Sequence, residues 1–385
     1  MQSRILFTAR DVGAAQQIEV IYKYFTKNRF HTTLLASGAA LNYFQIKNID
    51  AQPFFYDKNK YTVLKNASRT EIEKLLHSAH IILLENKPDA IICGLSTFHY
   101  GIDEAILYWA NSNRDNIPSF QFLETWGTFN HIDDGLPDMY LGFDKATQDF
   151  IKKEAQTPII IVGSPKHDEY KNLPVEKWRN EFPETIRIQT QTTKIIGFFA
   201  QSPEIPGQLY NFTNLVESLR NYQKKSSCKL LFREHPNSIG QYSHYWKVIE
   251  KHNIDAIDVT KEKIVEKLIS ICDIVATCYS TVAIDHAFLC SYGNCPVGVS
   301  LYLLCGNEIK DFLLSEYGYW KNPILERGVG FFVEDHELLT EKINMILTSN
   351  QFAKEYYFNS KALQHYAFSC DNIQKIVSDF IRKRH

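Results

Sequence analysis

Short apolar runs alternate with amphipathic stretches along the first 165 residues. The apolar runs at 5–8, 32–36, 90–93, 119–123, 139–141 and 159–162 are expected to be strands. The stretches at 14–28, 40–47, 70–86, 103–113 and 145–154 have the spacing of helices. Short strands without a polar face, alternating with helices, predict a parallel sheet that is covered on both faces.

The alternation begins again after residue 190. Expected strands lie at 194–200, 229–233, 254–258, 274–276 and 296–299, and expected helices at 208–222, 243–252, 261–270, 282–289 and 336–349. Residues 166–190 are polar and rich in Lys, Glu and Pro, which indicates a linker. The pattern therefore predicts an α/β protein with two Rossmann-like domains, 1–165 and 191–357, and C-terminal helices at 358–385. Ligands of such sheets bind at the carboxyl ends of the strands, so we expect the site in a cleft between the two domains.

Size, charge and cysteine use narrow the class of protein. A chain of 385 residues suits two hydrophobic cores. The formal net charge of −2 provides no overall field that would attract nucleic acid. The eight cysteines show no zinc-finger spacing and mostly stand in apolar runs, as reduced core residues do. No secretory signal or 18-residue apolar run is present, which favours a cytoplasmic protein. The basic segment at 381–385 allows at most peripheral membrane association. The sequence is compatible with either a monomer or an oligomer.

Two segments of the first half are candidates for catalysis. The loop after the first strand contains Arg10, Asp11 and Gly13 directly before a long helix. Asp11 and Gly13 could simply form the cap and turn, or Arg10 and Asp11 could contact an anion and act as a base. The strand at 119–123 runs into a loop with Glu124 and His131, which could perform acid and base chemistry on a hydroxyl group. Trp126 in that loop could form an apolar wall, or belong to the core.

Two segments of the second half are candidates for phosphate binding. Arg233 and His235 follow a strand and stand beside a turn-forming proline, where they could clamp a pyrophosphate. Ser280 and Thr281 precede a helix, and their hydroxyl and amide groups suit a phosphate at a helix N-terminus. Asp285 lies one helical turn further and could accept a hydrogen bond from a ribose hydroxyl. The alternative is that the hydroxyls cap the helix and that Asp285 is an ordinary surface acid.

These motifs, in this order, resemble the glycosyltransferase B (GT-B) superfamily. The likeness rests on the Asp-x-Gly-x-Ala loop at 11–15, the acidic and tryptophan-containing loop at 124–126, the Val-Gly-Ser-Pro-Lys-His-Asp run at 162–168, the Arg-x-His-Pro turn at 233–236, and the Cys-Tyr-Ser-Thr run at 278–281 before Asp285. Within the superfamily, bacterial capsule and polyglycerol-phosphate transferases and UDP-N-acetylglucosamine 2-epimerases are most similar. The resemblance implies a donor nucleotide on the C-terminal domain, an acceptor on the N-terminal domain, C-terminal helices that cross back to the N-terminal domain, and no required metal.

The function that the resemblance implies is transfer of a sugar or polyol phosphate from a nucleotide-activated donor to a glycan or lipid-linked acceptor in cell-surface polysaccharide synthesis. The donor would be a UDP-, CMP- or CDP-linked substrate, with no further cofactor. Asp11, Glu124 and His131 would be the catalytic residues. One alternative is a UDP-sugar 2-epimerase or hydrolase, although the Gly-Gly pair of those enzymes is replaced by Tyr-Ser-Thr at 279–281. The other is a non-catalytic binding protein of the same fold.

Overall fold

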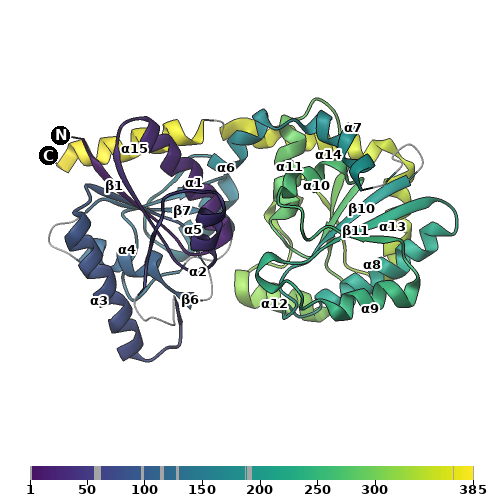
Figure 1. The fold of residues 1–385 in the computed structure, drawn as a ribbon, viewed down its shortest axis with the longest axis horizontal. Coiled ribbons are helices and arrows are strands. Elements are labelled where there is room, and N and C mark those ends of the chain that lie inside the picture. Colours follow the sequence, from purple (N-terminus) through teal and green to yellow (C-terminus); the bar gives the residue numbers. More distant parts are fainter. Residues whose placement is uncertain are drawn as a thin grey trace. The chain divides into compact units, whose positions relative to one another are not determined.

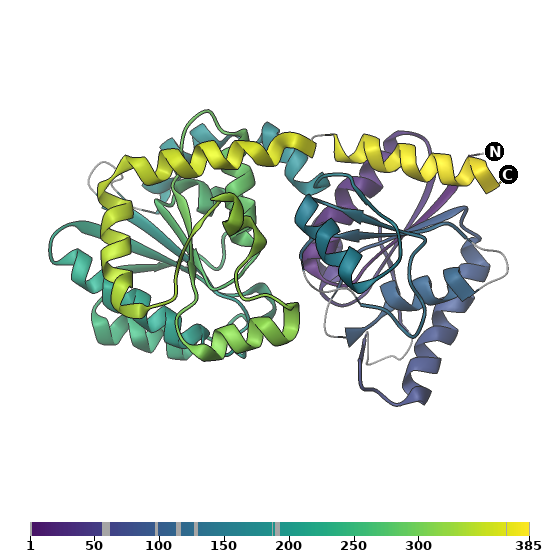
Figure 2. The ribbon, with the colours of Figure 1, turned by 180° about the vertical axis from the view of Figure 1, so that it is seen from behind.

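A computed structural model gives the fold of the chain. It describes residues 2–55, 62–96, 99–112, 117–126, 130–186, 188, 193–366 and 368–384. The chain forms two compact units (Figures 1 and 2). The first unit contains Met1–Asp168 and Tyr366–His385, and the second contains Glu169–His365.

The first unit is built on a parallel seven-stranded sheet with the order β3-β2-β1-β5-β7-β8-β9. Its strands are β1 (Arg4–Ala9), β2 (His31–Ala36), β3 (Gln52–Pro53), β5 (Ala90–Cys93), β7 (Ser119–Leu123), β8 (Met139–Gly142) and β9 (Ile159–Ile161). Its helices are α1 (Val12–Lys27), α2 (Gly38–Ile46), α3 (Arg69–Asn86), α4 (Ile102–Ser112), α5 (Lys145–Glu154), α6 (Pro165–Asp168) and α15 (Ser369–Arg384). A small antiparallel pair joins β4 (Val63–Leu64) to β6 (His99–Tyr100). Apolar residues of α3 and α4 pack against the central strands and form the main core on that side of the sheet.

The second unit has a parallel six-stranded sheet with the order β12-β11-β10-β13-β14-β15. Its strands are β10 (Thr193–Phe199), β11 (Ser227–Arg233), β12 (Ala256–Asp258), β13 (Ile274–Thr277), β14 (Val299–Leu303) and β15 (Phe331–Val333). Its α-helices are α7 (Val175–Thr185), α8 (Gln208–Gln223), α9 (Ser243–His252), α10 (Val265–Ile271), α11 (Val282–Tyr292), α12 (Asn307–Tyr317), α13 (Leu339–Thr348) and α14 (Asn350–Ser360). Buried rings of Phe198, Phe212, Phe232 and Tyr245 pack together under β10 and β11. The predicted α/β class with two Rossmann-like parallel sheets is confirmed.

Some element boundaries differ from those expected. Residues 166–190, expected as a linker, contain α7, whose Arg179 donates a hydrogen bond from Nη1 to the carbonyl of Ser270 at 2.6 Å. The strand expected at 296–299 begins only at Val299. Gly298 has φ +106° and lies so close to the chain that a Cβ there would be 2.2 Å from the carbonyl oxygen of Cys272. Helix α12 was not among the expected elements, although its buried Ile309 and Leu313 stand four positions apart, as on one face of a helix.

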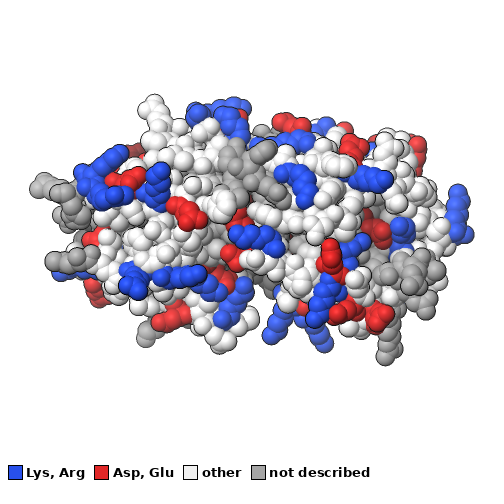
Figure 3. Space-filling view, turned by 90° about the horizontal axis from the view of Figure 1, so that it is seen from above, with Lys and Arg blue, Asp and Glu red and all other residues white. Residues whose placement is uncertain are grey.

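Two further observations concern the class of protein expected from the sequence. All eight cysteines are free, and all but Cys295 are buried. Among the residues that the structure describes, no helix combines the length and apolar character needed to cross a bilayer. On the face seen in Figure 3, Lys and Arg side chains lie among Asp and Glu side chains rather than in one continuous basic area.

Candidate functional site

Each sheet has one position where the order of its strands reverses. In the first unit, β1 lies between β2 and β5, which belong to opposite directions of winding. In the second unit, β10 lies between β11 and β13 in the same way. The loops that leave adjacent strands diverge there and leave room at the carboxyl ends, which is where ligands of doubly wound sheets bind. All but one of the predicted residues lie on the loops or helix starts at these two edges, and the exception is His131, at the far end of the loop after β7.

Asp11 begins α1 at the carboxyl end of β1. Its Oδ1 accepts a hydrogen bond from the Ala14 amide at 2.8 Å, which is the geometry of an N-cap. Burial raises the pKa of the Asp11 carboxyl, while the Ala14 amide and the Arg10 charge oppose that rise. A carboxyl group with a raised pKa is a better proton acceptor when ionised, so the capping role and a role as a base are compatible.

Glu124 approaches the same helix start from the end of β7. A Cβ added to Gly13 would lie 2.4 Å from Oε1 of Glu124. Only glycine therefore leaves room for this carboxylate beside the first turn of α1. The two segments predicted separately from the sequence thus meet at one edge through Gly13 and Glu124, which lie at the same helix start as Asp11.

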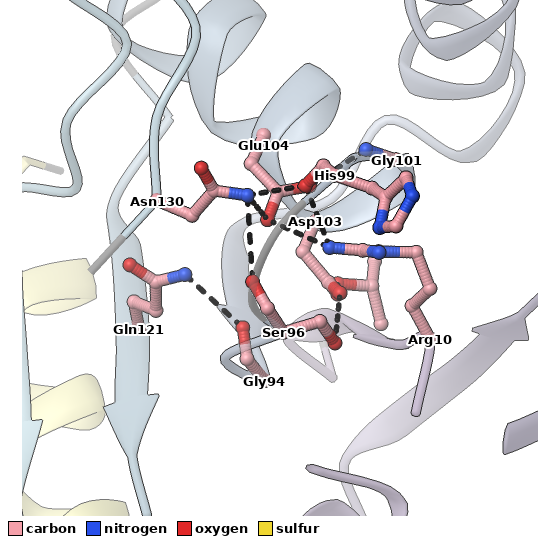
Figure 4. A network of polar contacts seen from close by, with 10 residues as sticks. Arg10, Gly94, Ser96, His99, Gly101, Asp103, Glu104, Gln121 and Asn130 are labelled. Atoms are coloured by element: carbon pink, nitrogen blue, oxygen red, sulfur yellow. Dashed lines mark hydrogen bonds and ion pairs between the residues drawn. The ribbon is translucent and has the colours of Figure 1, made fainter. Parts of the chain in front are cut away.

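A buried polar network lies behind this edge and is centred on the first turn of α4 (Figure 4). Arg10 is 7% exposed, and its Nη2 donates to the carbonyl of His99 at 2.9 Å and lies 3.4 Å from Oε1 of Glu104. The Nδ2 of Asn130 donates to the same Oε1 at 3.0 Å. Arg10, predicted as an anion contact, is therefore paired with a buried carboxylate of its own unit.

Asp103, the neighbour of Glu104 in α4, is also fully buried. Thr8 donates its hydroxyl to Oδ1 of Asp103 at 2.5 Å, and the Ser96 hydroxyl lies 3.5 Å from Oδ2. Burial, together with the negative charge of Glu104, raises the pKa of Asp103 to about 8. Asp103 is therefore mostly protonated at pH 7, and the hydroxyls of Thr8 and Ser96 lie beside its two oxygens.

The remaining residues of the 122–131 loop are placed differently. Trp126 is only 2% exposed, donates from Nε1 to Asp144 at 2.9 Å and packs against Phe143, so it belongs to the core. His131 donates from Nδ1 to the carbonyl of Asp133 at 2.5 Å, so its ring is engaged in the turn that follows. Residues 127–129 of the motif lie outside the described residues.

In the second unit, the start of α11 lies at the carboxyl end of β13. Thr281 is the exposed N-cap residue, and its side chain makes no capping hydrogen bond. The Ser280 amide donates to the Thr277 hydroxyl, and the Val282 amide donates to the Ser280 hydroxyl, both at 3.3 Å. Such a helix start presents amide groups and the positive end of the helix dipole to an anion.

The Arg-Glu-His-Pro turn leaves β11, on the other side of β10 from β13, at the same edge. Arg233 donates from Nη1 to the carbonyl of Glu262 at 2.5 Å, and its burial lowers the pKa of its guanidinium. Burial also lowers the pKa of His235, so its imidazole is neutral at pH 7. A neutral imidazole still offers one N–H donor to a phosphate oxygen.

Gln201 ties these two loops to the end of β10. Its Oε1 accepts from the Tyr279 amide at 3.1 Å, and its carbonyl accepts from the Tyr242 hydroxyl at 2.7 Å. Tyr242 in turn accepts from the His235 amide at 3.2 Å. The two predicted phosphate-binding segments are thereby fixed to one another through Gln201, a residue that the sequence analysis did not identify.

Asp285 lies on α11 and is 5% exposed. Its carboxylate is close to Tyr170, whose hydroxyl donates to Glu266 at 2.9 Å. Burial and the carboxylates of Asp285 and Glu266 raise the pKa of the Tyr170 hydroxyl. Asp285 is therefore not the surface acid of the alternative interpretation, and it has a partner within its own unit.

Sequence reasoning missed the buried groups of the first unit, above all Asp103, Glu104, Ser96 and Asn130. A signal was present, because two acidic residues open the helix at 102–112. Acids in the first turn of a helix are common as partners of the helix dipole, so their burial cannot be foreseen. Among the described residues, no three His, Cys, Asp or Glu side chains are arranged to hold a metal ion.

Comparison with known proteins gives a family similarity for part of the chain. Residues 150–290 match the family model described as CDP-glycerol:poly(glycerophosphate) glycerophosphotransferase. The matched segment includes the turn at 233–236 and the start of α11. A search among curated protein sequences finds no match to this chain.

Solved structures resemble the chain over its whole length. A putative UDP-N-acetylglucosamine 2-epimerase from Listeria monocytogenes has a TM-score of 0.71 at 12% identity, over 100% of this chain and 98% of that chain. S. aureus MnaA in a co-structure with UDP has a TM-score of 0.69 at 11% identity, over 99% and 97%. Acinetobacter baumannii MurG has a TM-score of 0.63 at 11% identity, over 98% and 100%. These similarities show that the chain has the GT-B fold, as its sequence motifs predicted.

Proposed function

We propose that the chain is a transferase that moves a sugar or polyol phosphate from a nucleotide-activated donor to a hydroxyl group of a glycan or lipid-linked acceptor. The observation that carries the proposal is the edge formed by Gln201, His235 and the start of α11, within the segment that resembles glycerophosphotransferases. A UDP-, CMP- or CDP-linked donor would place its phosphates there. Arg233, His235, Ser280 and Thr281 would contact these phosphates, and Asp285 would contact the ribose.

The first unit would supply the acceptor site. Asp11 or Glu124 would take the proton of the acceptor hydroxyl, whose oxygen forms the new bond to the anomeric carbon or to the phosphorus that bears the polyol. The bond between that atom and the bridging phosphate oxygen breaks, and the nucleotide leaves with the electron pair. The dipole of α11 and the imidazole N–H of His235 would stabilise the charge on the leaving phosphate, so that no resident metal is needed. His131 is the least supported of the proposed catalytic residues, because its ring bonds to the following turn.

An epimerase or hydrolase of UDP-sugars is the alternative that the structural similarities support. Such an enzyme acts on the nucleotide sugar without an acceptor. The start of α11 in this chain carries the bulky Tyr279 and the hydroxyl side chains of Ser280 and Thr281 in place of a glycine pair, which favours a different contact to the donor.

A thermal-shift screen tests the proposal. UDP, CDP, CMP, GDP, ADP and their conjugates, including CDP-glycerol, would be added at millimolar concentration with and without EDTA. A ligand that binds only the folded protein raises its melting temperature. We expect one pyrimidine nucleotide class to stabilise the protein, with no loss in EDTA. If no nucleotide stabilises the chain, the binding-protein alternative is favoured. Turnover of a nucleotide sugar without any acceptor would support the epimerase or hydrolase.

A further inference from the structure

Glu104 is a fully enclosed ionisable group behind the edge of the first unit. It stands at the third position of α4, and none of its side-chain surface is exposed. Taking a carboxylate out of water costs several kcal/mol unless hydrogen bonds or an opposite charge compensate. The hydrogen-bond and ion-pair partners of Glu104 therefore show what compensates for the burial of its carboxylate.

Three hydrogen-bond donors from three different segments converge on this carboxylate. The Gly101 amide donates to Oε2 at 2.7 Å, and Nδ2 of Asn130 donates to Oε1 at 3.0 Å. The guanidinium of Arg10 lies 3.4 Å from the same Oε1. Capping of α4 explains only the Gly101 contact. The other two contacts reach the loop after β1 and the loop after β7, the loops that contain Asp11 and Glu124.

The carbonyl of His99 completes the arrangement. It accepts from Arg10 at 2.9 Å and also from Asn130, so both side chains are held at two points each (Figure 4). A Cβ on Gly101 would lie 2.4 Å from Cδ of Arg10, so the arginine side chain lies directly against the backbone before α4. The side chain of Arg10 is therefore held by Glu104 and by the segment at 99–101 that precedes α4.

We propose that Glu104 is a positioning residue that fixes the loops of Asp11 and Glu124 relative to each other by holding Arg10 and Asn130. It acts through these two side chains and does not touch the substrate. Its consequence for catalysis rests on the proposed function, because only that function makes Asp11 and Glu124 the proton acceptors. The mechanical part of the inference, that one buried carboxylate orders two loops, does not depend on which reaction the protein performs.

The test compares Glu104→Gln with Asp103→Asn. Both positions are adjacent in α4 and fully buried, and both changes replace a carboxyl by an amide of the same shape. All partners of Glu104 are donors, so the NH2 of the introduced side-chain amide must face one of them unpaired, and the ion pair with Arg10 is lost. The partners of Asp103 are hydroxyl groups, which can accept as well as donate. Asp103→Asn is therefore the matched control.

Hydrogen–deuterium exchange of the free protein gives a readout that is independent of activity. In Glu104→Gln, we expect peptides that contain residues 10–13 and 122–126 to exchange about 10-fold faster, because local opening of these loops becomes easier. In Asp103→Asn, and in peptides from β10 to β13 of both variants, exchange should stay as in the wild type. Equal exchange in the two variants, or acceleration spread over the whole first unit, would overturn the proposal.

A second comparison covers the case in which Glu104→Gln fails to fold because Arg10 is left buried without its partner. In the double variant Arg10→Gln with Glu104→Gln, neither charge remains, so the desolvation cost is smaller than in the single variant. We expect it to fold and to show the same faster exchange near Asn130. If it folds with wild-type exchange there, Glu104 does not order the loops.

Kinetics connects the ordering to the reaction. With the donor identified by the thermal-shift screen, Glu104→Gln should lower kcat about 10-fold or more while stabilisation by that nucleotide stays unchanged. Loss of kcat in Asp103→Asn to the same extent would contradict the specific role. Faster exchange without any transferase activity in the wild type would leave the ordering role intact and refute the proposed function instead.

Discussion

In both units, the candidate residues lie where the strand order of a parallel sheet reverses, but the charged groups at the two positions differ. At the strand reversal of the first unit, Asp11, Glu124 and the buried Glu104 accompany a single arginine that is already paired. At the reversal of the second unit, the start of α11 and the turn with His235 and Arg233 lie at the edge, and Arg233 donates to the carbonyl of Glu262. A parallel sheet thus fixes where a ligand binds, and the loop residues decide which charge the ligand can carry.

This difference supports a division of tasks between the units. An acid-rich edge repels phosphate groups and suits hydroxyl groups that give up a proton. A helix N-terminus with an arginine and an imidazole suits phosphate groups. Substitutions that alter one edge test this division, because the other edge serves as an internal control.

The largest effect is expected for Asp11→Asn. Asn preserves the cap on α1, because its side-chain oxygen also accepts from the Ala14 amide, but it cannot take a proton. We expect kcat to fall by about 10²- to 10⁴-fold in the transfer assay. Stabilisation by the nucleotide should be unchanged, since the second unit is intact. Full activity of this variant would leave Glu124 as the only candidate base among the two.

A smaller effect is expected for His235→Ala. The change removes an N–H donor to phosphate and keeps the backbone contact to Tyr242. A hydrogen bond to a charged group contributes about 1.5–3 kcal/mol, so nucleotide affinity should fall by about 10- to 100-fold in calorimetric titration. His244→Ala, on the exposed start of α9, is the control and should bind as the wild type does. Equal losses in both variants would speak against a phosphate contact at His235.

Thr281→Asp tests the helix start with two effects of opposite sign. A carboxylate at the N-terminus of α11 should stabilise the free protein by about 0.3–1 kcal/mol, because it interacts favourably with the helix dipole. The same charge repels phosphate, so nucleotide affinity should fall about 10-fold. Ser243→Asp at the exposed start of α9 provides the control, in which stability rises and affinity does not change. Unchanged affinity in Thr281→Asp would place the phosphates elsewhere.

The smallest effect on activity is expected for Asp103→Asn, whose stability relative to wild type depends on pH. The folded state holds the Asp103 proton up to a pKa of about 8, whereas the unfolded chain releases it near its ordinary value of 3.8. The folded state therefore binds more protons between pH 4 and 8, and the contribution of Asp103 to stability falls as pH rises through this window. Asn does not titrate. The melting temperature of Asp103→Asn relative to wild type should rise from pH 5 to pH 8 and level off above it, by about 2–4 °C for each kcal/mol. A constant difference would mean that Asp103 is ionised in the fold.

The sequence predicted the fold well, because short strands without polar positions, such as 90–93 and 274–276, have few other uses than a parallel sheet. The sequence pattern did not predict the helix and strand boundaries that depend on tertiary contacts. Helix α7 forms in a polar segment because Phe182 and Pro183 are buried within the second unit. Strand β14 begins only after Gly298, because the backbone of Cys272 and Asp273 lies against that glycine.

The sequence predicted the candidate residues that directly follow strands, but not the buried residues that hold them in place. Asp11, Glu124 and His235 follow apolar runs directly, so their position along the chain places them at an edge. Glu104, Asn130 and Gln201 act through distant partners, separated by 78 positions between Gln201 and Tyr279 and 94 between Arg10 and Glu104. Local spacing carries no information about such pairs.

The most direct test of the division between the two edges is hydrogen–deuterium exchange with and without the stabilising nucleotide. We predict slower exchange in peptides that contain residues 233–236 and 277–285 and unchanged exchange in peptides that contain residues 10–13 and 122–126. Protection confined to the two segments of the first unit would contradict the assignment of the donor phosphates to the second unit.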